Sequence, residues 1–383
     1  MVLKVRVICL LVYILSVGCS YQTEDHKQLF QAELDKIVSS KFDWTPGVSM
    51  SVYAPNDHID WSGTAGVSEL KNFQDLSVNQ PFRIASVTKS FVAVAILRLQ
   101  EEGLLSIEDP IQTYISNQHN AILKSGGYDP AKITIRQCLN HTSGLYDYVL
   151  GTHENPSPYL SIIVKNPKKR WTRTEQLEGA IQWGKPKGTP GEIYHYGDTG
   201  YILLGEIIEK LSNKSLGYAI DSLVNYEKIG MRATWLESMQ EVKVQAELIH
   251  CYYQRKDYSE FDASIDLYGG GGLISTTRDL ALFYYHLFNG NIFKYDTTIG
   301  LMLSPTKLLN TSNESDEQED YRLGVQVFNL YDGQIVAHSG LWDTYVLYSP
   351  KHNVSMAIKF TDGGNEYLIK KTISIINKIQ ELK

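Results

Sequence analysis

The sequence predicts an α/β (α+β) fold in which an antiparallel sheet is flanked by helices and interrupted by a mainly helical insertion. Segments that alternate like strands lie near both ends of the 383-residue chain, at residues 47–67 and 324–361. Between residues 107 and 262 the sequence is instead helical or irregular. Hydrophobic residues make up 43% of the chain, which is enough for a large buried core.

The first third of the chain carries the clearest local signals. Residues 24–41 are predicted to form an amphipathic helix, with one apolar side made of Leu29, Phe30, Leu34 and Ile37. The strand-like stretches 47–54 and 58–67 are separated by Pro-Asn-Asp, which is the turn chemistry of a hairpin. Apolar residues then recur at helical spacing from 90 to 102 and stop before a glycine, so a mostly buried helix is expected there.

Helix signals return after the irregular middle of the chain. A run of four glycines, residues 269–272, precedes a predicted helix for which Ser275 or Thr276 would be the N-cap. The last strands are followed by a predicted helix from Tyr367 to Leu382. We therefore expect a sheet domain made of residues 19–106 and 264–383, a mainly helical domain at 107–263, and an active site between them.

The N-terminus is typical of a secretory signal peptide, which we place at residues 1–18. Lys4 and Arg6 precede an apolar run from Val7 to Val17 that is too short to span a bilayer. Cys19 follows this segment and resembles the lipid-modified cysteine of bacterial lipoproteins. We expect an exported protein, either periplasmic or an outer-membrane lipoprotein tethered to the membrane through Cys19.

Charge and cysteine content exclude several function classes. The chain has 36 basic and 43 acidic residues, so it lacks the positive field that would gather nucleic acid. Cys138 and Cys251 are the only pair in the mature chain that could form a disulfide. No histidine or cysteine spacing typical of a metal site occurs, so neither a metal nor another cofactor is expected.

One serine and lysine pair has the context of a catalytic site. The spacing S-x-x-K occurs three times, beginning at Ser68, Ser86 and Ser304, but only Ser86 opens a long apolar helix. Residues three apart share a helix face, so Lys89 is expected to lie beside the Ser86 hydroxyl. The N–H groups and the positive dipole end of the helix would favour an alkoxide or oxyanion.

The same pair has a purely structural interpretation. If Lys89 is buried near the helix N-terminus, desolvation and the dipole disfavour its charged form, and it can take a proton from serine. Alternatively, Ser86 caps the helix and Lys89 is a surface residue, as short motifs often arise by chance. Other parts of the sequence have to decide between these alternatives.

Two further segments favour the catalytic interpretation of Ser86 and Lys89. Tyr196-Gly197-Asp198 precedes a predicted helix, and His338-Ser339-Gly340 lies where one predicted strand meets the next. Together with Ser86 and Lys89, their order and spacing resemble the three motifs of the serine β-lactamase and penicillin-binding protein family. The match is to its class C-like branch, which includes esterases and D-peptidases; residues 139–145 and 270–276 are similar to this branch as well. The resemblance implies a β-lactamase/transpeptidase-like fold.

The resemblance also implies a role for each motif. Ser86 would attack an acyl carbonyl while Lys89 and Tyr196 handle its proton. The backbone N–H groups of Ser86 and Leu341 would form an oxyanion hole. A peptide-like substrate would dock as an added strand beside His338, Ser339 and Gly340.

Asp198 departs from the pattern, because the family usually has asparagine at this position. A neutral amide both donates and accepts hydrogen bonds, whereas an ionised carboxylate only accepts them. We therefore expect weaker binding of amide groups on a substrate side chain. Alternatively, Asp198 caps the helix predicted from Thr199 to Leu211.

Other residues in the motifs have structural alternatives too. Tyr196 is one of 25 tyrosines and could be a packed aromatic residue. His338 could be an ordinary strand residue, and His141 is predicted to be structural in its loop. Gly270 to Gly272 are expected to serve a turn or a close backbone approach, because no lysine follows as in a phosphate-binding loop.

The sequence thus predicts a secreted serine hydrolase that acts through a Ser86 acyl-enzyme on the amide or ester bond of a small-molecule or peptide substrate. A D-alanyl-D-alanine-type carboxypeptidase and a true class C β-lactamase remain open as narrower activities. An alternative of a different class is a receptor that binds penicillin or cell-wall peptide without turnover. A conventional α/β-hydrolase is disfavoured, because no G-x-S-x-G motif is present. We expect a monomer.

Overall fold

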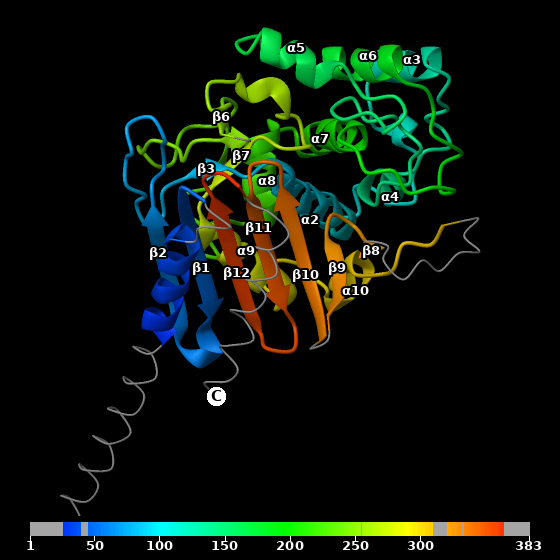
Figure 1. Ribbon diagram of the computed structural model, residues 1–383. Helices are drawn as coiled ribbons and strands as arrows, with labels where there is room; N and C mark the ends of the chain where they lie inside the picture. Colours follow the sequence, from blue (N-terminus) through cyan, green and yellow to red (C-terminus); the bar gives the residue numbers. More distant parts are fainter. Residues whose placement is uncertain (1–25, 40–44, 254, 309–319, 331–332, 364–383) are drawn as a thin grey trace, which may run out of the picture.

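The computed structural model describes residues 26–39, 45–253, 255–308, 320–330 and 333–363 (Figure 1). The predicted signal peptide, Cys19 and the helix predicted at 367–382 lie outside the described residues. Within them, the predicted combination of an antiparallel sheet and flanking helices is confirmed.

The main sheet has seven strands in the order β2-β1-β12-β11-β10-β9-β8, and all neighbours are antiparallel. Segments from early and late in the described part of the chain meet where β1 pairs with β12, in a register that sets Val48 opposite Phe360. The strands are β1 (Gly47–Ala54), β2 (Ile59–Gly66), β8 (Asp320–Tyr321), β9 (Gln326–Leu330), β10 (Gly333–Gly340), β11 (Thr344–Ser349) and β12 (Val354–Phe360).

The predicted hairpin forms between β1 and β2. Its Pro-Asn-Asp turn is the short 3₁₀ helix η1 (Pro55–Asp57), and His58 leaves it with a left-handed φ of 58°. Proline has no backbone N–H, and the first position of this turn does not require one. The hairpin lies at one edge of the sheet, where β2 is the outermost strand and β1 pairs with β12 on its other side.

Two of the predicted helices are largely buried. The helix α9 (Thr277–Phe288) packs on β1, β11 and β12, and the Thr276 hydroxyl caps it by accepting the N–H of Asp279 at 3.1 Å. Of the two predicted caps, Thr276 is therefore the correct one. The helix predicted at 90–102 is α2 (Thr88–Glu101), which is buried on nearly all sides.

Most of the remaining helices lie beyond one end of the sheet, with α3, α5 and α6 farthest from it, while α10 lies beside β9 (Figure 1). The remaining helices are α3 (Asn117–Ser125), α4 (Ile135–Leu139), α5 (Tyr159–Lys165), α6 (Arg173–Trp183), α7 (Thr199–Ser212), α8 (Leu216–Val224) and α10 (Asp296–Met302), with the 3₁₀ helices η2 (Ala85–Val87), η3 (Ile111–Thr113) and η4 (Ala263–Ile265). A three-stranded sheet joins β3 (Phe82–Arg83), β7 (Leu273–Ser275) and β4 (Trp235–Leu236), and β5 (Tyr252–Tyr253) pairs with β6 (Lys256–Asp257). The boundaries predicted for the two domains remain a prediction.

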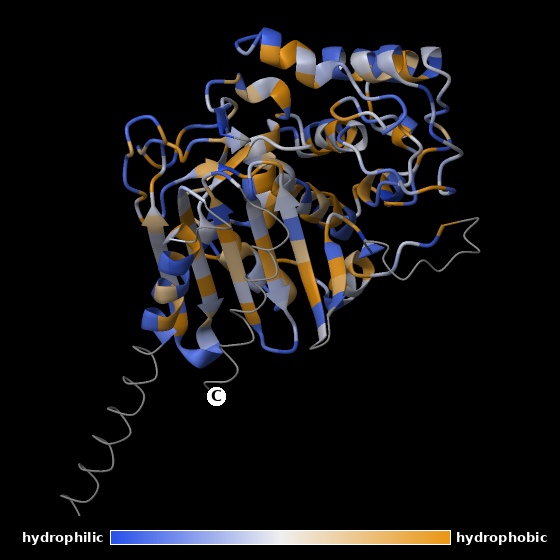
Figure 2. Ribbon diagram, viewed as in Figure 1, coloured by the Kyte–Doolittle hydropathy of each residue, from blue (hydrophilic) through white to orange (hydrophobic). Residues whose placement is uncertain are grey.

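Apolar side chains form two cores, and the hydropathy colouring of Figure 2 shows the alternation along the strands that feed them. The larger core surrounds α2, α7, α8 and α9. The smaller one lies on the other face of the sheet, where residues 26–39 are helical. From the apolar side predicted for this helix, Phe30, Leu34 and Ile37 are buried there and Leu29 is only half-buried. Among the described residues, no helix is long and apolar enough to cross a membrane.

Candidate active site

Ser86 occupies the middle of η2, directly before α2. The preceding Ala85 has a left-handed φ of 45°, which is strained for a residue with a Cβ and is typical of functional turns. The strand β10 comes close to this turn, since a Cβ on Gly340 would lie 2.3 Å from the Ile84 carbonyl oxygen. Glycine at 340 therefore permits the contact that brings β10 beside Ser86.

Lys89 lies one helical turn after Ser86 and is fully buried. Its Nζ donates a hydrogen bond to Ser86 Oγ at 2.9 Å and another to the Gly270 carbonyl at 2.7 Å. It also forms an ion pair with Asp198. The alternative in which Lys89 is a surface residue is therefore wrong.

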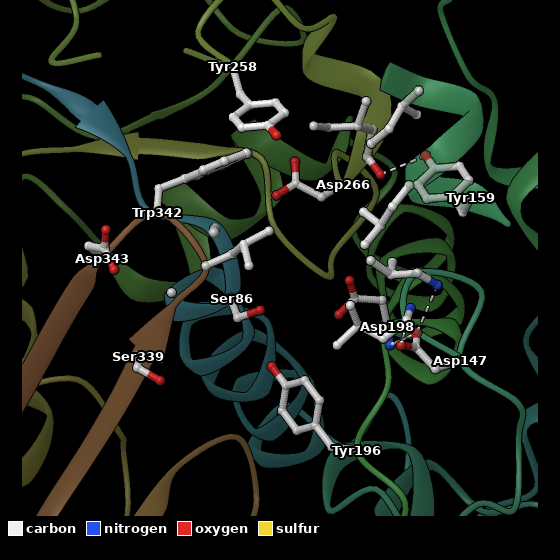
Figure 3. Close-up of a pocket in the computed structure, with 18 of the residues that line it drawn as sticks. Ser86, Asp147, Tyr159, Tyr196, Asp198, Tyr258, Asp266, Ser339, Trp342 and Asp343 are labelled. Carbon is white, nitrogen blue, oxygen red and sulfur yellow. Dashed lines mark hydrogen bonds between the residues drawn. The ribbon is translucent and has the colours of Figure 1, made fainter. Parts of the chain in front are cut away.

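Tyr196 completes the surroundings of the serine hydroxyl. In Figure 3 the hydroxyl groups of Ser86 and Tyr196 point toward one another, and, although burial raises the pKa of the Tyr196 phenol, the proximity of Ser86 and Lys89 acts to lower it. The Lys89 Nζ lies 5.1 Å from the centre of the tyrosine ring. Two chain segments separated by about 110 residues thus meet at one hydroxyl group.

The charges of this cluster favour its protonated form. Burial opposes the charge of Lys89, as expected from the sequence, but the Asp198 carboxylate outweighs this effect and the pKa of Lys89 is raised. Burial raises the pKa of Tyr196, Lys89 opposes that shift, and Asp198 adds to it. The resting site therefore favours a lysine ammonium and a neutral phenol, which differs from the uncharged lysine expected from desolvation and the helix dipole.

Asp198 stands at the N-cap position of α7, but its side chain makes no capping hydrogen bond. The helix-cap alternative is therefore wrong. The Asp198 backbone N–H donates to Asp147 Oδ1 at 3.0 Å, which fixes the position of its side chain relative to Lys89. Burial and the negative charge of Asp198 raise the pKa of Asp147 to about 6.

His338 is buried in β10 and its ring is occupied by protein partners. Its Nδ1–H donates to the Ser339 carbonyl at 2.8 Å, and its Nε2 accepts from the Tyr321 hydroxyl at 2.9 Å. Burial and the positive charge of Lys89 lower the pKa of His338 to about 3, so the ring is neutral. Ser339, Gly340 and Leu341 line the same cavity as Ser86.

Three further residues contact the motif residues. No pattern in the sequence predicts these contacts. Asp147 holds the Asp198 backbone, and Tyr321 holds the His338 ring. His141, predicted to be structural, accepts the Gly197 N–H at 3.3 Å and has its ring centre 4.2 Å from that of Tyr196. Burial and Lys89 lower its pKa, so it supports Tyr196 as a neutral ring.

The glycine-rich turn after η4 serves close approach, as predicted. A Cβ on Gly270 would lie 2.7 Å from Asp198 Cγ, and one on Gly271 would lie 2.1 Å from Asp266 Oδ2. The turn also provides the carbonyl that binds Lys89. Two carboxylates thus fit against this backbone because it carries no side chains.

All these elements surround a cavity of about 630 Å³ (Figure 3). Ser86, Tyr196, Asp198 and Ser339 form part of its wall. Much of the rest is apolar or aromatic and includes Val149, Leu150, Leu160, Ile163, Tyr258, Phe261 and Trp342. A polar reacting group in a largely apolar cavity suits a small acyl substrate.

A comparison with family models decides the assignment, since residues 34–376 match the model described as Beta-lactamase. The chain belongs to the beta-lactamase family. The resemblance noted from its motifs is confirmed.

Relatives of this beta-lactamase-family protein include two kinds of bacterial protein. Penicillin-binding protein 4* of Bacillus subtilis is 29% identical over 296 residues, which cover 73% of this chain and 60% of that protein. Protein flp of Staphylococcus aureus is 24% identical over 363 residues, covering 89% of this chain and 64% of that one. The chain thus spans less than two thirds of the length of these curated relatives.

Solved structures confirm the predicted fold. A D-stereospecific amidohydrolase from Streptomyces sp. has a TM-score of 0.71 and 25% identity, covering 88% of this chain and 95% of that one. A D-amino acid amidase from Ochrobactrum anthropi has a TM-score of 0.73 and 20% identity, covering 94% of this chain and 98% of that one. The likeness to the second shows the fold alone.

Cysteine and metal chemistry play no visible part in the described site. Cys138 and Cys251, whose pairing the sequence left open, are both free and buried. Burial raises the pKa of both thiols, to about 12 for Cys138 and about 11 for Cys251. In the described part of the chain, no group of three or more His, Cys, Asp or Glu residues is arranged to hold a metal ion.

Proposed function

We propose that this protein hydrolyses the amide or ester bonds of a small-molecule or peptide substrate through an acyl-enzyme on Ser86. The observation that carries the proposal is the 2.9 Å contact between Lys89 Nζ and Ser86 Oγ in the wall of the cavity. Tyr196 and Asp198 approach the same two groups from another element. Neither Ser68 nor Ser304 has a comparable set of neighbours, since Ser68 Oγ donates to the Gln74 carbonyl and Ser304 Oγ to the Leu301 carbonyl.

The first step would be attack of Ser86 Oγ on the substrate carbonyl carbon. One proton must leave the Lys89 and Tyr196 pair beforehand, because both groups are protonated at rest and neither can then accept the serine proton. The pair takes up that proton as the C–O bond forms. The N–H groups of Ser86 and Leu341 are proposed to bind the resulting oxyanion.

The second half of the reaction would return the enzyme to its initial state. The proton passes from the Lys89 and Tyr196 pair to the leaving amine or alcohol as its bond to the carbonyl carbon breaks. A water molecule then attacks the acyl-enzyme and gives its proton to the same pair. Release of the carboxylic acid returns that proton to Ser86 Oγ.

The proposed setting of this reaction is outside the cytoplasm. The basic residues Lys4 and Arg6 followed by the apolar run to Val17 support export, and Cys19 supports a lipid tether.

Mass spectrometry of the intact protein tests the proposal. The protein is mixed with a penicillin and, separately, with an activated ester such as p-nitrophenyl acetate. A transient mass increase with release of hydrolysed product is the expected result. A stable adduct with no product would favour the receptor alternative, and no adduct with either reagent would contradict the proposal.

A further inference from the structure

Asp266 is a carboxylate in the cavity wall for which the structure shows no partner. It directly follows η4, and Figure 3 shows its side chain among Tyr258, Trp342 and Asp198 in the same cavity as Ser86. Within the described residues, its side chain forms no hydrogen bond and no ion pair. Its sequence neighbours Ile265 and Leu267 are buried, so the carboxylate is anchored at the cavity rather than on a mobile surface.

Each of the other charged groups near Asp266 has at least one protein partner. Asp198 is paired with Lys89, and Asp147 accepts three backbone N–H bonds. The Arg83 guanidinium, a nearby positive charge, is held by Glu237 at 2.8 and 2.9 Å and by the Phe261 carbonyl at 2.8 Å. In contrast to Asp198 and Asp147, Asp266 is therefore a carboxylate of this wall that has neither a hydrogen bond nor an ion pair among the described residues.

The surroundings of Asp266 disfavour its charged form. Burial and the negative charge of Asp198 raise the pKa of Asp266 to about 7; Glu237 adds to the shift, while Arg83 and Lys89 oppose it. The backbone of Gly271 lies against its Oδ2, where any larger residue would displace it. A carboxylate in such a place is stabilised when a ligand brings a positive charge.

Aromatic side chains nearby also suit a cation. Tyr258 and Trp342 line the cavity beside Asp266 with their ring centres 6.0 Å apart. Aromatic faces attract ammonium groups, and the attraction is stronger where water is excluded. A primary ammonium can donate to the carboxylate and contact these rings at the same time.

We propose that Asp266 is a specificity residue that binds a primary ammonium group on the acyl part of the substrate. This inference rests on the proposed function. The leaving group departs before water enters for the second step, whereas the acyl part stays on Ser86 through both steps. A fixed carboxylate in the cavity wall is therefore better placed to bind the acyl part than the leaving group. The preferred substrates are then amides or esters of acyl groups with a free amine close to the scissile carbonyl, such as amino acid or N-terminal peptide derivatives.

Glycine p-nitroanilide and N-acetylglycine p-nitroanilide test the proposal without a question of stereochemistry. The wild-type protein is expected to have at least a tenfold higher kcat/KM for the free amine, since a hydrogen bond to a charged group is worth about that factor or more. Asp266→Asn is expected to remove this preference, so that the ratio of kcat/KM for the two substrates falls from at least ten to about one. Asp343→Asn is the matched control, because it removes another cavity carboxylate that lies beyond Trp342 in Figure 3, and it should retain the preference.

A second measurement does not depend on turnover. The folded pKa of Asp266 lies above its unfolded value, so the native state binds more protons and its free energy of unfolding falls as pH rises from about 4 to 7. Asp266→Asn should therefore raise the midpoint of thermal unfolding more at pH 8 than at pH 4. Millimolar glycine amide should raise the wild-type midpoint at pH 8 and leave that of Asp266→Asn unchanged.

The outcomes separate this inference from the proposed function. Equal use of both glycine substrates, or the same loss with both in Asp266→Asn, would overturn the role of Asp266. If Ser86 is still acylated by a neutral activated ester in that case, the hydrolase proposal stands and only the inference fails. If the neutral ester labels nothing, the proposed function itself fails.

Discussion

Lys89 and Asp198 form a buried ion pair at the N-terminus of α2, and Lys89 also contacts the hydroxyl group of Ser86. The pair joins α2, which directly follows the serine, to the segment that carries Tyr196 and Asp198. It also fixes the protonation of the resting site, because the carboxylate raises the pKa of Lys89 despite complete burial. The family pattern usually has asparagine at this position, so this pair distinguishes the chain from that pattern.

Asp198→Asn should shift the pH dependence of catalysis toward lower pH. Loss of the carboxylate lowers the pKa of Lys89 and of Tyr196, so the pair loses its proton at lower pH. We expect the rising limb of kcat/KM to move down by about one pH unit or more. The measurement is kcat/KM against pH with one ester and one β-lactam, and the amide should favour the β-lactam more than the ester. Superimposable profiles for the two proteins would show that Asp198 has no effect on the chemistry.

Lys89→Met should lower stability as well as abolish acylation. Removing the lysine leaves the Asp198 charge buried without a partner, which costs roughly 3 kcal/mol of unfolding free energy or more. The double variant Lys89→Met with Asp198→Asn should recover much of this loss in denaturant unfolding but should stay unable to react. A double variant no more stable than Lys89→Met would mean that the pair contributes nothing to the fold.

Gly340→Ala should impair the reaction by moving β10. The added methyl group would meet the Ile84 carbonyl oxygen at 2.3 Å, so the strand has to shift away from η2 and the proposed oxyanion hole widens. We expect about a hundredfold fall in kcat/KM, as small displacements of catalytic groups produce losses of this size. The control is Gly300→Ala in α10, where the methyl group meets nothing within 4 Å and should stabilise the helix by up to about 1 kcal/mol. Equal activity of the two variants would contradict the role given to Gly340.

Cys19 should become the first residue of the mature protein. The predicted signal peptide ends at residue 18, and a lipid on the cysteine would make the native protein partition into detergent. N-terminal mass analysis of protein expressed with its own leader measures this, and Cys19→Ala should release the protein into the aqueous phase. An unmodified Cys19, or an N-terminus a few residues away, would indicate a secreted protein without a lipid tether.

Local patterns in the sequence predicted the mixed fold and the position of Lys89 beside Ser86, whereas the catalytic interpretation of this pair also needed the motifs at residues 196–198 and 338–340. Strand alternation at both ends of the chain predicts the mixed fold, and the Pro-Asn-Asp turn predicts the β1–β2 hairpin. The spacing of three residues on one helix face predicts the contact of Lys89 with Ser86. Each of these features depends on residues close in sequence or on a strict period.

Contacts between distant loops were not predictable in the same way. Asp147, Asp266 and Tyr321 belong to no periodic element, and each reaches the site from its own loop or short strand. The pKa of Lys89 could be assigned a direction only with Asp198 in place, because burial alone predicts the opposite shift. The acidic wall near Ser86 is thus a property of the tertiary structure.

Peptide mapping of the trapped adduct tests the central claim most directly. The protein is quenched in acid soon after mixing with the activated ester or a penicillin, digested, and analysed for the residue that carries the added mass. The account predicts label on Ser86 and none in Ser86→Ala. Label on Ser68 or Ser304, or undiminished label in Ser86→Ala, would contradict it.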